Sequence, residues 1–168
     1  MKSPDLKIRP ETHTDVSAIR AVNTAAFPTA AEAALVDRLR GRLQPWISLV
    51  AEAGGVVGHI LFTPVQLGAH SAMALGPMAV LPGHQRDGVG LALVRAGLQA
   101  CADAGHNLVF VLGHPDYYTR FGFKPTHAFG ISCEFQAPPE AFMVAELQPG
   151  ALQGMRGIVR YHAAFNDV

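Results

Sequence analysis

Apolar residues that recur every three to four positions predict three long helices. The first covers Thr12–Phe27, the second runs from about Ala30 to Leu43, and the third covers 88–104. Thr12 or Thr14 can cap the first helix, because a hydroxyl accepts a hydrogen bond from an unpaired amide of the first turn. Each of these helices presents one apolar face to a core.

Shorter apolar runs between glycine and proline residues predict the strands of one sheet. Gly54–Gly55 is expected to form the two-residue turn of an antiparallel hairpin, with a looser turn at 67–70 leading into the next strand. The succession of strand, helix and buried strand across 73–112 predicts a parallel pair with a right-handed crossover. Strands are predicted at 6–9, 47–52, 56–62, 73–81, 108–112, 130–135, 141–147 and 157–161, and a short helix at 115–120.

These elements predict the α/β (α+β) class. We expect a single domain over residues 1–168, with a mixed, mostly antiparallel central sheet of about six to eight strands flanked by helices. A chain of 168 residues can bury about 70% of the surface that its unfolded form exposes, so the core needs no metal or disulfide. Gly76-Pro77 interrupts the predicted strand at 73–81, because the proline lacks a backbone donor and the glycine lacks a side chain. This pair predicts a bulge in the strand.

The composition is that of a globular protein, with 49% hydrophobic and 15% charged residues. The 13 Lys and Arg balance the 13 Asp and Glu, so no net field attracts nucleic acid or an anionic membrane. No apolar run reaches the roughly 18 residues of a membrane-spanning helix, and the first residues lack the apolar stretch of a signal peptide. Cys101 and Cys133 form no CxxC pair. These features predict a reduced, cytoplasmic protein.

Metal and thiol chemistry are not expected. The eight histidines include no HExxH or HxxxH pair, and two isolated cysteines cannot form a zinc site alone. Cys133 has no recognisable histidine partner, so it is a poor candidate for a nucleophile.

The most informative segment joins a predicted strand directly to a predicted helix and reads Gln85-Arg86-Asp87-Gly88-Val89-Gly90. Glycine leaves the backbone amides of such a loop accessible, and the positive end of the helix dipole lies beside them, which suits a pyrophosphate. Alternatively, Gly88 and Gly90 only let the helix pack closely on the sheet. Val89-Gly90 stands where a P-loop has Lys followed by Ser or Thr, and no GxGxxG occurs, so neither ATP nor NAD is favoured.

This loop resembles the signature of the GNAT superfamily of N-acetyltransferases, (Gln/Arg)-x-x-Gly-x-(Gly/Ala), which lies between a bulged strand and a helix. The resemblance begins at Leu75 and resumes in Tyr118-Thr119-Arg120-Phe121-Gly122-Phe123, which is similar to the Tyr-x-x-x-Gly-Phe segment of many of these enzymes. The order of strands and helices also agrees over most of the chain. Asp87 departs from the family pattern, since it puts a carboxylate near the implied pyrophosphate unless it caps the helix and points outward.

The resemblance implies a GNAT-like fold and acetyl-CoA as the acyl donor. In the family, free backbone groups of the bulged strand bind the pantetheine arm and polarise the thioester carbonyl, which assigns these contacts to Met78, Ala79 and Val80. The loop Gln85–Gly90 is implied to bind the pyrophosphate. Tyr118 aligns with the tyrosine that protonates the departing thiolate, and Tyr117 is the alternative.

The implied reaction transfers an acetyl group from acetyl-CoA to a primary amine by direct attack in a ternary complex. Glu32 and His114 are the candidate contacts for the acceptor, a small molecule or a peptide, although either can be a solvated surface residue. The strand at 73–81 contains no carboxylate or histidine, so the general base is not identified. A non-catalytic acyl-CoA sensor or interaction domain is an alternative function, and a purely structural domain is another. The apolar C-terminal strands suggest a homodimer.

Overall fold

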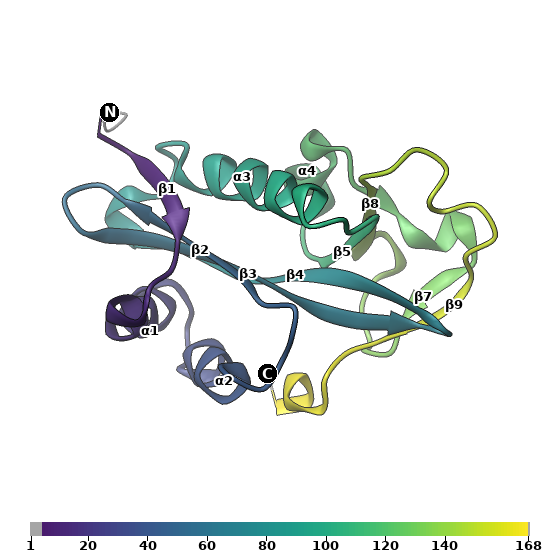
Figure 1. Ribbon diagram of the computed structural model, residues 1–168, viewed down its shortest axis with the longest axis horizontal. Coiled ribbons are helices and arrows are strands. Elements are labelled where there is room, and N and C mark those ends of the chain that lie inside the picture. Colours follow the sequence, from purple (N-terminus) through teal and green to yellow (C-terminus); the bar gives the residue numbers. More distant parts are fainter. Residues whose placement is uncertain (1–4, 168) are drawn as a thin grey trace.

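A central sheet separates two groups of helices (Figure 1). The computed structural model describes residues 5–167. In it, α1 (Val16–Ala26) and α2 (Ala31–Leu39) cover one face of the sheet. α3 (Val89–Asp103) and α4 (Pro115–Tyr118) lie on the opposite face. The sheet is therefore covered on both sides, as its long apolar strands require.

Within residues 5–167 the sheet has nine strands in the order β1-β2-β3-β4-β5-β8-β6, and β9 pairs with both β3 and β7. The β4–β5 and β7–β9 pairs are parallel and the others are antiparallel, which confirms the predicted mixed architecture. The number of strands exceeds the predicted six to eight because β6, which pairs with β8, has two residues and is too short to show a hydrophobic period. The strands are β1 Lys7–Pro10, β2 Ile47–Glu52, β3 Val56–Leu67, β4 His70–Val80, β5 Leu108–Leu112, β6 Lys124–Pro125, β7 Ile131–Cys133, β8 Phe142–Glu146 and β9 Gly157–Arg160.

The hairpin of β3 and β4 is longer than the sequence predicts. The prediction ended the first strand at Phe62, before Pro64, yet Pro64 lies inside β3 opposite Met73. On its other side, β3 pairs with β2 as far as Phe62 and with β9 from Gln66 onward. Pro64 therefore occupies a gap between two partner strands, where its missing N–H costs no ladder bond.

The ends of several elements differ from the prediction by a few residues. A 3-10 turn at His13–Asp15 precedes α1, and Thr12 N donates to Asp15 Oδ2 at 2.7 Å within a capping box. α2 ends at Leu39 rather than Leu43, and Gly41 follows with a left-handed backbone (φ +79°). The turn before β3 has three residues instead of two, because Glu52 pairs with Val56.

β4 and β5 separate partway along their length, and this separation positions the site. Parallel register joins Met73–Leu75 to Val109–Val111 and then stops, whereas β4 continues to Val80. The separation begins at the predicted bulge, where Gly76-Pro77 lies opposite a single residue of β3. Gly76 has a φ of +149°, which residues with a side chain rarely adopt. From Met78 to Val80, β4 has no partner on its β5 side among the described strands.

Apolar side chains fill both faces of the sheet. On the α3 side, Gly97 lies so close to Phe62 that a methyl group at Gly97 would be 2.2 Å from the ring. On the opposite side, α1 and α2 pack on β2 and β3 through Ile19, Val36, Val50 and Leu61. Among residues 5–167, none of the helices combines the length and the apolar character needed to cross a bilayer.

Candidate active site

The loop between β4 and α3 brings backbone amides to the free end of β4. Gly88 is the N-cap of α3 with a left-handed backbone (φ +84°), and Arg86 has a φ of +67°, which is unusual for a residue with a side chain. Gln85 Nε2 donates to Val80 O at 3.1 Å and so ties the loop to the strand. The first amides of α3, a 15-residue helix, have no intrahelical acceptor and carry partial positive charge. The loop thus has the geometry of an anion-binding site.

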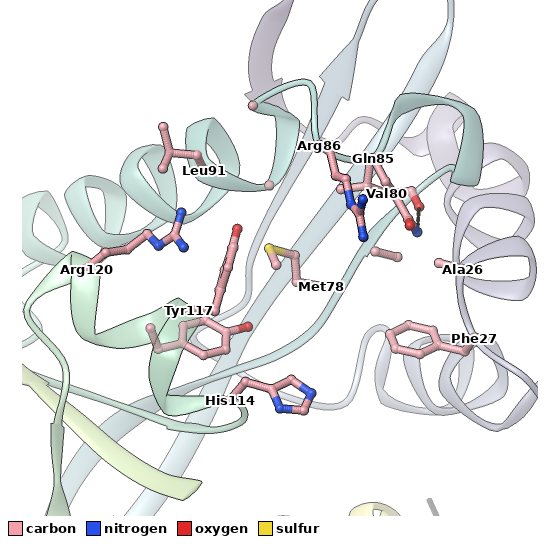
Figure 2. A pocket seen from close by; sticks show the side chains of 14 residues that line it. Ala26, Phe27, Met78, Val80, Gln85, Arg86, Leu91, His114, Tyr117 and Arg120 are labelled. Carbon is pink, nitrogen blue, oxygen red and sulfur yellow. Dashed lines mark hydrogen bonds between the residues drawn. The ribbon is translucent and has the colours of Figure 1, made fainter.

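A cleft of about 900 Å³, which we call the loop cleft, lies between this loop, β4 and α4 (Figure 2). The side chain of Met78 lies between Tyr117 and Phe27 (Figure 2). Arg86 and Arg120 line the cleft, and none of the described residues lining it is a carboxylate. The loop cleft therefore suits a ligand that carries negative charge.

A second cavity of about 580 Å³ adjoins the loop cleft, and we call it the bulge cavity because Gly76-Pro77 lines it. Both cavities are lined by Phe27, Met78, His114 and Tyr118. The carboxylate in the wall of the bulge cavity is Glu32, and no described Lys or Arg lines it. The walls of the bulge cavity also include the apolar and aromatic residues Leu35, Leu75, Val111, Leu112, Phe135, Tyr161 and Phe165.

Tyr118 lies where the two cavities meet. Its side chain is buried, with 9% exposure, and its ring packs edge-on against Tyr117 and Phe123 at centroid distances of 5.0 and 5.7 Å. Burial raises the pKa of the Tyr118 hydroxyl. This hydroxyl therefore stays protonated at neutral pH and can donate a proton to a group at the junction.

Tyr117 is held by different contacts. The guanidinium carbon of Arg120 lies 4.9 Å from the centroid of its ring. Burial raises the pKa of Tyr117, and the charge of Arg120 opposes this shift. The hydroxyl of Tyr117 lies against α3, since a methyl group at Gly90 would be 2.7 Å from that oxygen. Tyr117 lines only the loop cleft, whereas Tyr118 lines both cavities.

The residues singled out by the sequence are divided between these cavities. Val89 does not line either cavity; it is buried and faces Gly58 of β3, where a methyl group would be 2.9 Å from Val89 Cγ1. Asp87 also lines neither cavity, and it directly precedes Gly88, the N-cap residue of α3. Glu32 lines the bulge cavity, and His114 lines both cavities. The loop cleft brings together Met78, Ala79, Val80, Gln85, Arg86, Gly88, Gly90 and Tyr118.

Several residues that line the two cavities were not singled out from the sequence. Phe27 reaches the loop cleft from the end of α1, and Leu91 and Arg120 also line it. Arg120 had a detectable signal, since it lies inside the Tyr-x-x-x-Gly-Phe segment two positions after Tyr118. Three aromatic residues of the bulge cavity had no such signal, because the segment after β7 brings Phe135 there and the segment after β9 brings Tyr161 and Phe165.

Neither a metal cluster nor an activated thiol is found in the described part of the chain. Residues 5–167 contain no group of three or more His, Cys, Asp or Glu side chains placed to hold a metal ion. The sulfur of Cys133 accepts a hydrogen bond from Phe135 N at 3.4 Å, and burial raises the pKa of the thiol. A raised pKa keeps this thiol protonated and therefore poorly nucleophilic.

A strand with a free edge, an anion-binding loop at a helix N-terminus and a buried tyrosine between two cavities are features typical of acyltransferases. The family model described as an acetyltransferase (GNAT) domain matches residues 7–126, which is most of the chain. This chain therefore belongs to the GNAT acetyltransferase family, as its loop signature indicated. The prediction that it is an acyltransferase is confirmed.

Two relatives from Escherichia coli K12 are similar in sequence. The uncharacterized N-acetyltransferase YhbS is 34% identical over 163 residues, which cover 95% of this chain and 98% of that protein. The uncharacterized N-acetyltransferase YjhQ is 42% identical over 118 residues, which cover 66% of this chain and 65% of that protein.

Two solved structures are similar in fold. The crystal structure of E. coli YhbS in complex with CoA matches 96% of this chain and 92% of its own, with a TM-score of 0.91 and 34% identity. That of a GNAT family acetyltransferase from Brucella melitensis in complex with acetyl-CoA matches 95% of this chain and 97% of its own, with a TM-score of 0.77 and 36% identity. These matches confirm the GNAT fold.

Proposed function

We propose that this protein transfers an acetyl group from acetyl-CoA to a primary amine by direct attack in a ternary complex. The observation that carries the proposal is the junction of two cavities at Met78 and Tyr118. A donor in the loop cleft and an acceptor in the bulge cavity would meet there. Direct transfer requires this contact between two bound reactants, and it needs no nucleophile on the enzyme.

Acetyl-CoA suits the loop cleft in charge and in hydrogen bonding. Its pyrophosphate would accept hydrogen bonds from the first amides of α3, with Arg86 and Arg120 supplying positive charge. Its pantetheine arm is an extended chain with amide groups, which can bind to the free edge of β4 at Met78–Val80 as an added strand would. The complexes of E. coli YhbS with CoA and of the Brucella protein with acetyl-CoA support this assignment.

The proposed chemistry takes place where the two cavities meet. The amine enters as an ammonium ion and must lose a proton before its lone pair can attack the thioester carbon. His114, which lines both cavities, is the proposed acceptor of this proton. Attack forms the C–N bond and leaves negative charge on the carbonyl oxygen. A backbone amide within Met78–Val80 would stabilise this charge by about 3 to 4 kcal/mol.

Collapse of the tetrahedral intermediate then breaks the C–S bond. The departing thiolate takes the proton of Tyr118, whose raised pKa keeps it available at neutral pH. The nitrogen loses two protons in going from ammonium to amide. One of them replaces the proton of Tyr118, and the other leaves to solvent.

The proposal is tested in two stages. Thermal unfolding is measured with acetyl-CoA, CoA, ATP and NADH, and only the CoA species should stabilise the protein, by about 2.7 kcal/mol at about 100 times the dissociation constant. Acetylated product is then measured by mass spectrometry over a panel of amines, for the wild type and for Tyr118→Phe. Stabilisation without product from any amine would indicate a CoA-binding domain that does not catalyse, and no stabilisation would reject the cofactor.

A further inference from the structure

Glu32, the carboxylate in the wall of the bulge cavity, has one oxygen without a hydrogen-bond partner among the described residues. Glu32 lies in the first turn of α2, and its Oε1 atom is shielded from solvent without any hydrogen-bond partner in the described part of the chain. Such an oxygen has lost water and gained no donor, which is unfavourable. Because Glu32 lines the bulge cavity, a cationic N–H group inside the cavity can form a charge-assisted hydrogen bond with its carboxylate.

The other residues that line the bulge cavity are mostly apolar, and several of them are aromatic. Phe135 and Tyr161 have ring centroids 5.2 Å apart, and Tyr161 and Phe165 are also 5.2 Å apart. Burial raises the pKa of the Tyr161 hydroxyl, so this aromatic wall is uncharged at neutral pH. It can therefore bury the apolar part of a ligand. A volume of about 580 Å³ is typical of a site for a small molecule.

The two cavities also have opposite charge. Arg86 and Arg120 line the loop cleft without a carboxylate, whereas Glu32 lines the bulge cavity without a described Lys or Arg. An anionic donor and a cationic acceptor are thus directed to different sides of the junction at Met78. A carboxylate on the acceptor would find no Lys or Arg among the described residues that line the bulge cavity.

We propose that the bulge cavity binds a small primary amine with an aromatic or branched apolar body, and that Glu32 recognises its ammonium group. This inference rests on the proposed function, because the amine is the acceptor of the same transfer. Acetylation forms the C–N bond, removes two protons from the nitrogen and so removes the charge that pairs with Glu32. The neutral amide product therefore binds more weakly than the amine, which favours its release.

The probes are phenethylamine, its product N-acetylphenethylamine, and L-phenylalanine, which adds a carboxylate beside the amine. Their dissociation constants are measured by calorimetry with the protein alone and with the protein saturated with CoA. The variants are Glu32→Gln, which keeps the shape but removes the charge, and the control Glu140→Gln at an exposed position outside both cavities. Thermal unfolding of each variant verifies that it is folded.

The wild type and the control variant should bind phenethylamine at least about tenfold more tightly than either other probe. Glu32→Gln should lose this preference. Equal binding of amine and amide by the wild type, or unchanged selectivity in Glu32→Gln, would overturn the inference. If Glu32→Gln does not fold, the comparison of amine and amide binding by the wild type decides whether the inference holds. Selective binding without transfer to any amine would reject the proposed function alone, whereas transfer without this selectivity would reject the inference and leave the proposed function standing.

Discussion

Gly113 leaves the space that the ring of Tyr118 occupies. A methyl group at Gly113 would lie 2.5 Å from Tyr118 Cε2, which is well inside van der Waals contact. Gly113 directly follows β5, and its N–H donates to Ala141 O at 2.9 Å, which fixes its position against the segment before β8. The small size of residue 113 therefore determines where the proposed proton donor lies relative to the two cavities.

Gly113→Ala should displace Tyr118 and impair chemistry more than cofactor binding. Because a displacement of about 1 Å at a catalytic group can cost about 100-fold in rate, we expect kcat to fall at least about tenfold. The KM for acetyl-CoA should change less than about threefold, since the loop at Gln85–Gly90 is not touched. Steady-state kinetics test this, with Gly83→Ala as the control, because a methyl group at Gly83 meets no atom within 4 Å. Full activity in Gly113→Ala would argue against this placement of Tyr118.

The two adjacent tyrosines should differ in their contribution to turnover. Tyr118→Phe removes the proposed acid and should lower kcat by about 100-fold to 10,000-fold, whereas Tyr117→Phe should lower it less than about tenfold. Both variants should still be stabilised by acetyl-CoA in thermal unfolding, since each removes one hydroxyl and leaves the backbone amides of the loop in place. A larger loss in Tyr117→Phe than in Tyr118→Phe would transfer the role of acid to Tyr117.

Gly90 and Tyr117 should be coupled in stability. In the wild type, Gly90→Ala places a methyl group against the Tyr117 hydroxyl, and this contact offsets the gain of about 1 kcal/mol that alanine brings to a helix. In a Tyr117→Phe background the hydroxyl is gone, and the nearest remaining atoms are Met78 Cε at 3.6 Å and Tyr117 Cζ at 3.8 Å. Urea unfolding of the four proteins should give a coupling free energy of about 1 to 2 kcal/mol. Additive effects would show that the two groups do not meet.

His59 is buried in a polar network beneath α1. Its side chain has no exposed surface, its Nδ1 atom lies 3.1 Å from Asn23 Nδ2, and its Nε2 atom lies 2.9 Å from Ser48 Oγ. Burial lowers the pKa of His59 from 6.5 to about 3, and the charge of Arg40 adds to this shift. Between these two values the unfolded chain binds a proton that the folded protein does not. The contribution of neutral His59 to the free energy of unfolding is therefore complete above pH 6.5 and is lost as the pH falls toward 3.

The free energy of unfolding should fall by about 2 kcal/mol through His59 when the pH is lowered from about 7.5 to about 5. Urea unfolding at several pH values measures this dependence. His59→Gln should show a shallower decrease, and His70→Gln, at an exposed position, should keep the slope of the wild type. An unchanged slope in His59→Gln would mean that folding does not lower the pKa of this histidine.

Local patterns predicted most of the fold, and long-range packing accounts for what they missed. The bulge at Gly76-Pro77 and the parallel β4–β5 pair followed from residues close in sequence. Leu112 was expected inside a strand buried on both faces, but it is 40% exposed because it ends β5 beyond the last pair with β4 and lines the bulge cavity. The pairing of β9 with β3 and β7 joins distant segments and leaves no local signal.

The candidate site divides in the same way. The loop Gln85–Gly90 is contiguous, so its composition alone indicated an anion site. The bulge cavity is assembled from α2, the end of β5 and the C-terminal segment, which only the fold brings together. The sequence alone therefore gave little support for choosing Glu32 as a contact of the acceptor. The roles of the site residues, a cytoplasmic location and a homodimer stay predictions.

Direct transfer is tested most directly by initial velocities over a matrix of acetyl-CoA and amine concentrations, combined with the intact mass of the enzyme after exposure to acetyl-CoA alone. The proposed mechanism predicts double-reciprocal lines that intersect, because both substrates must be bound before any product leaves, and an enzyme of unchanged mass. Parallel lines together with an acetylated enzyme would contradict it and would indicate a covalent intermediate instead.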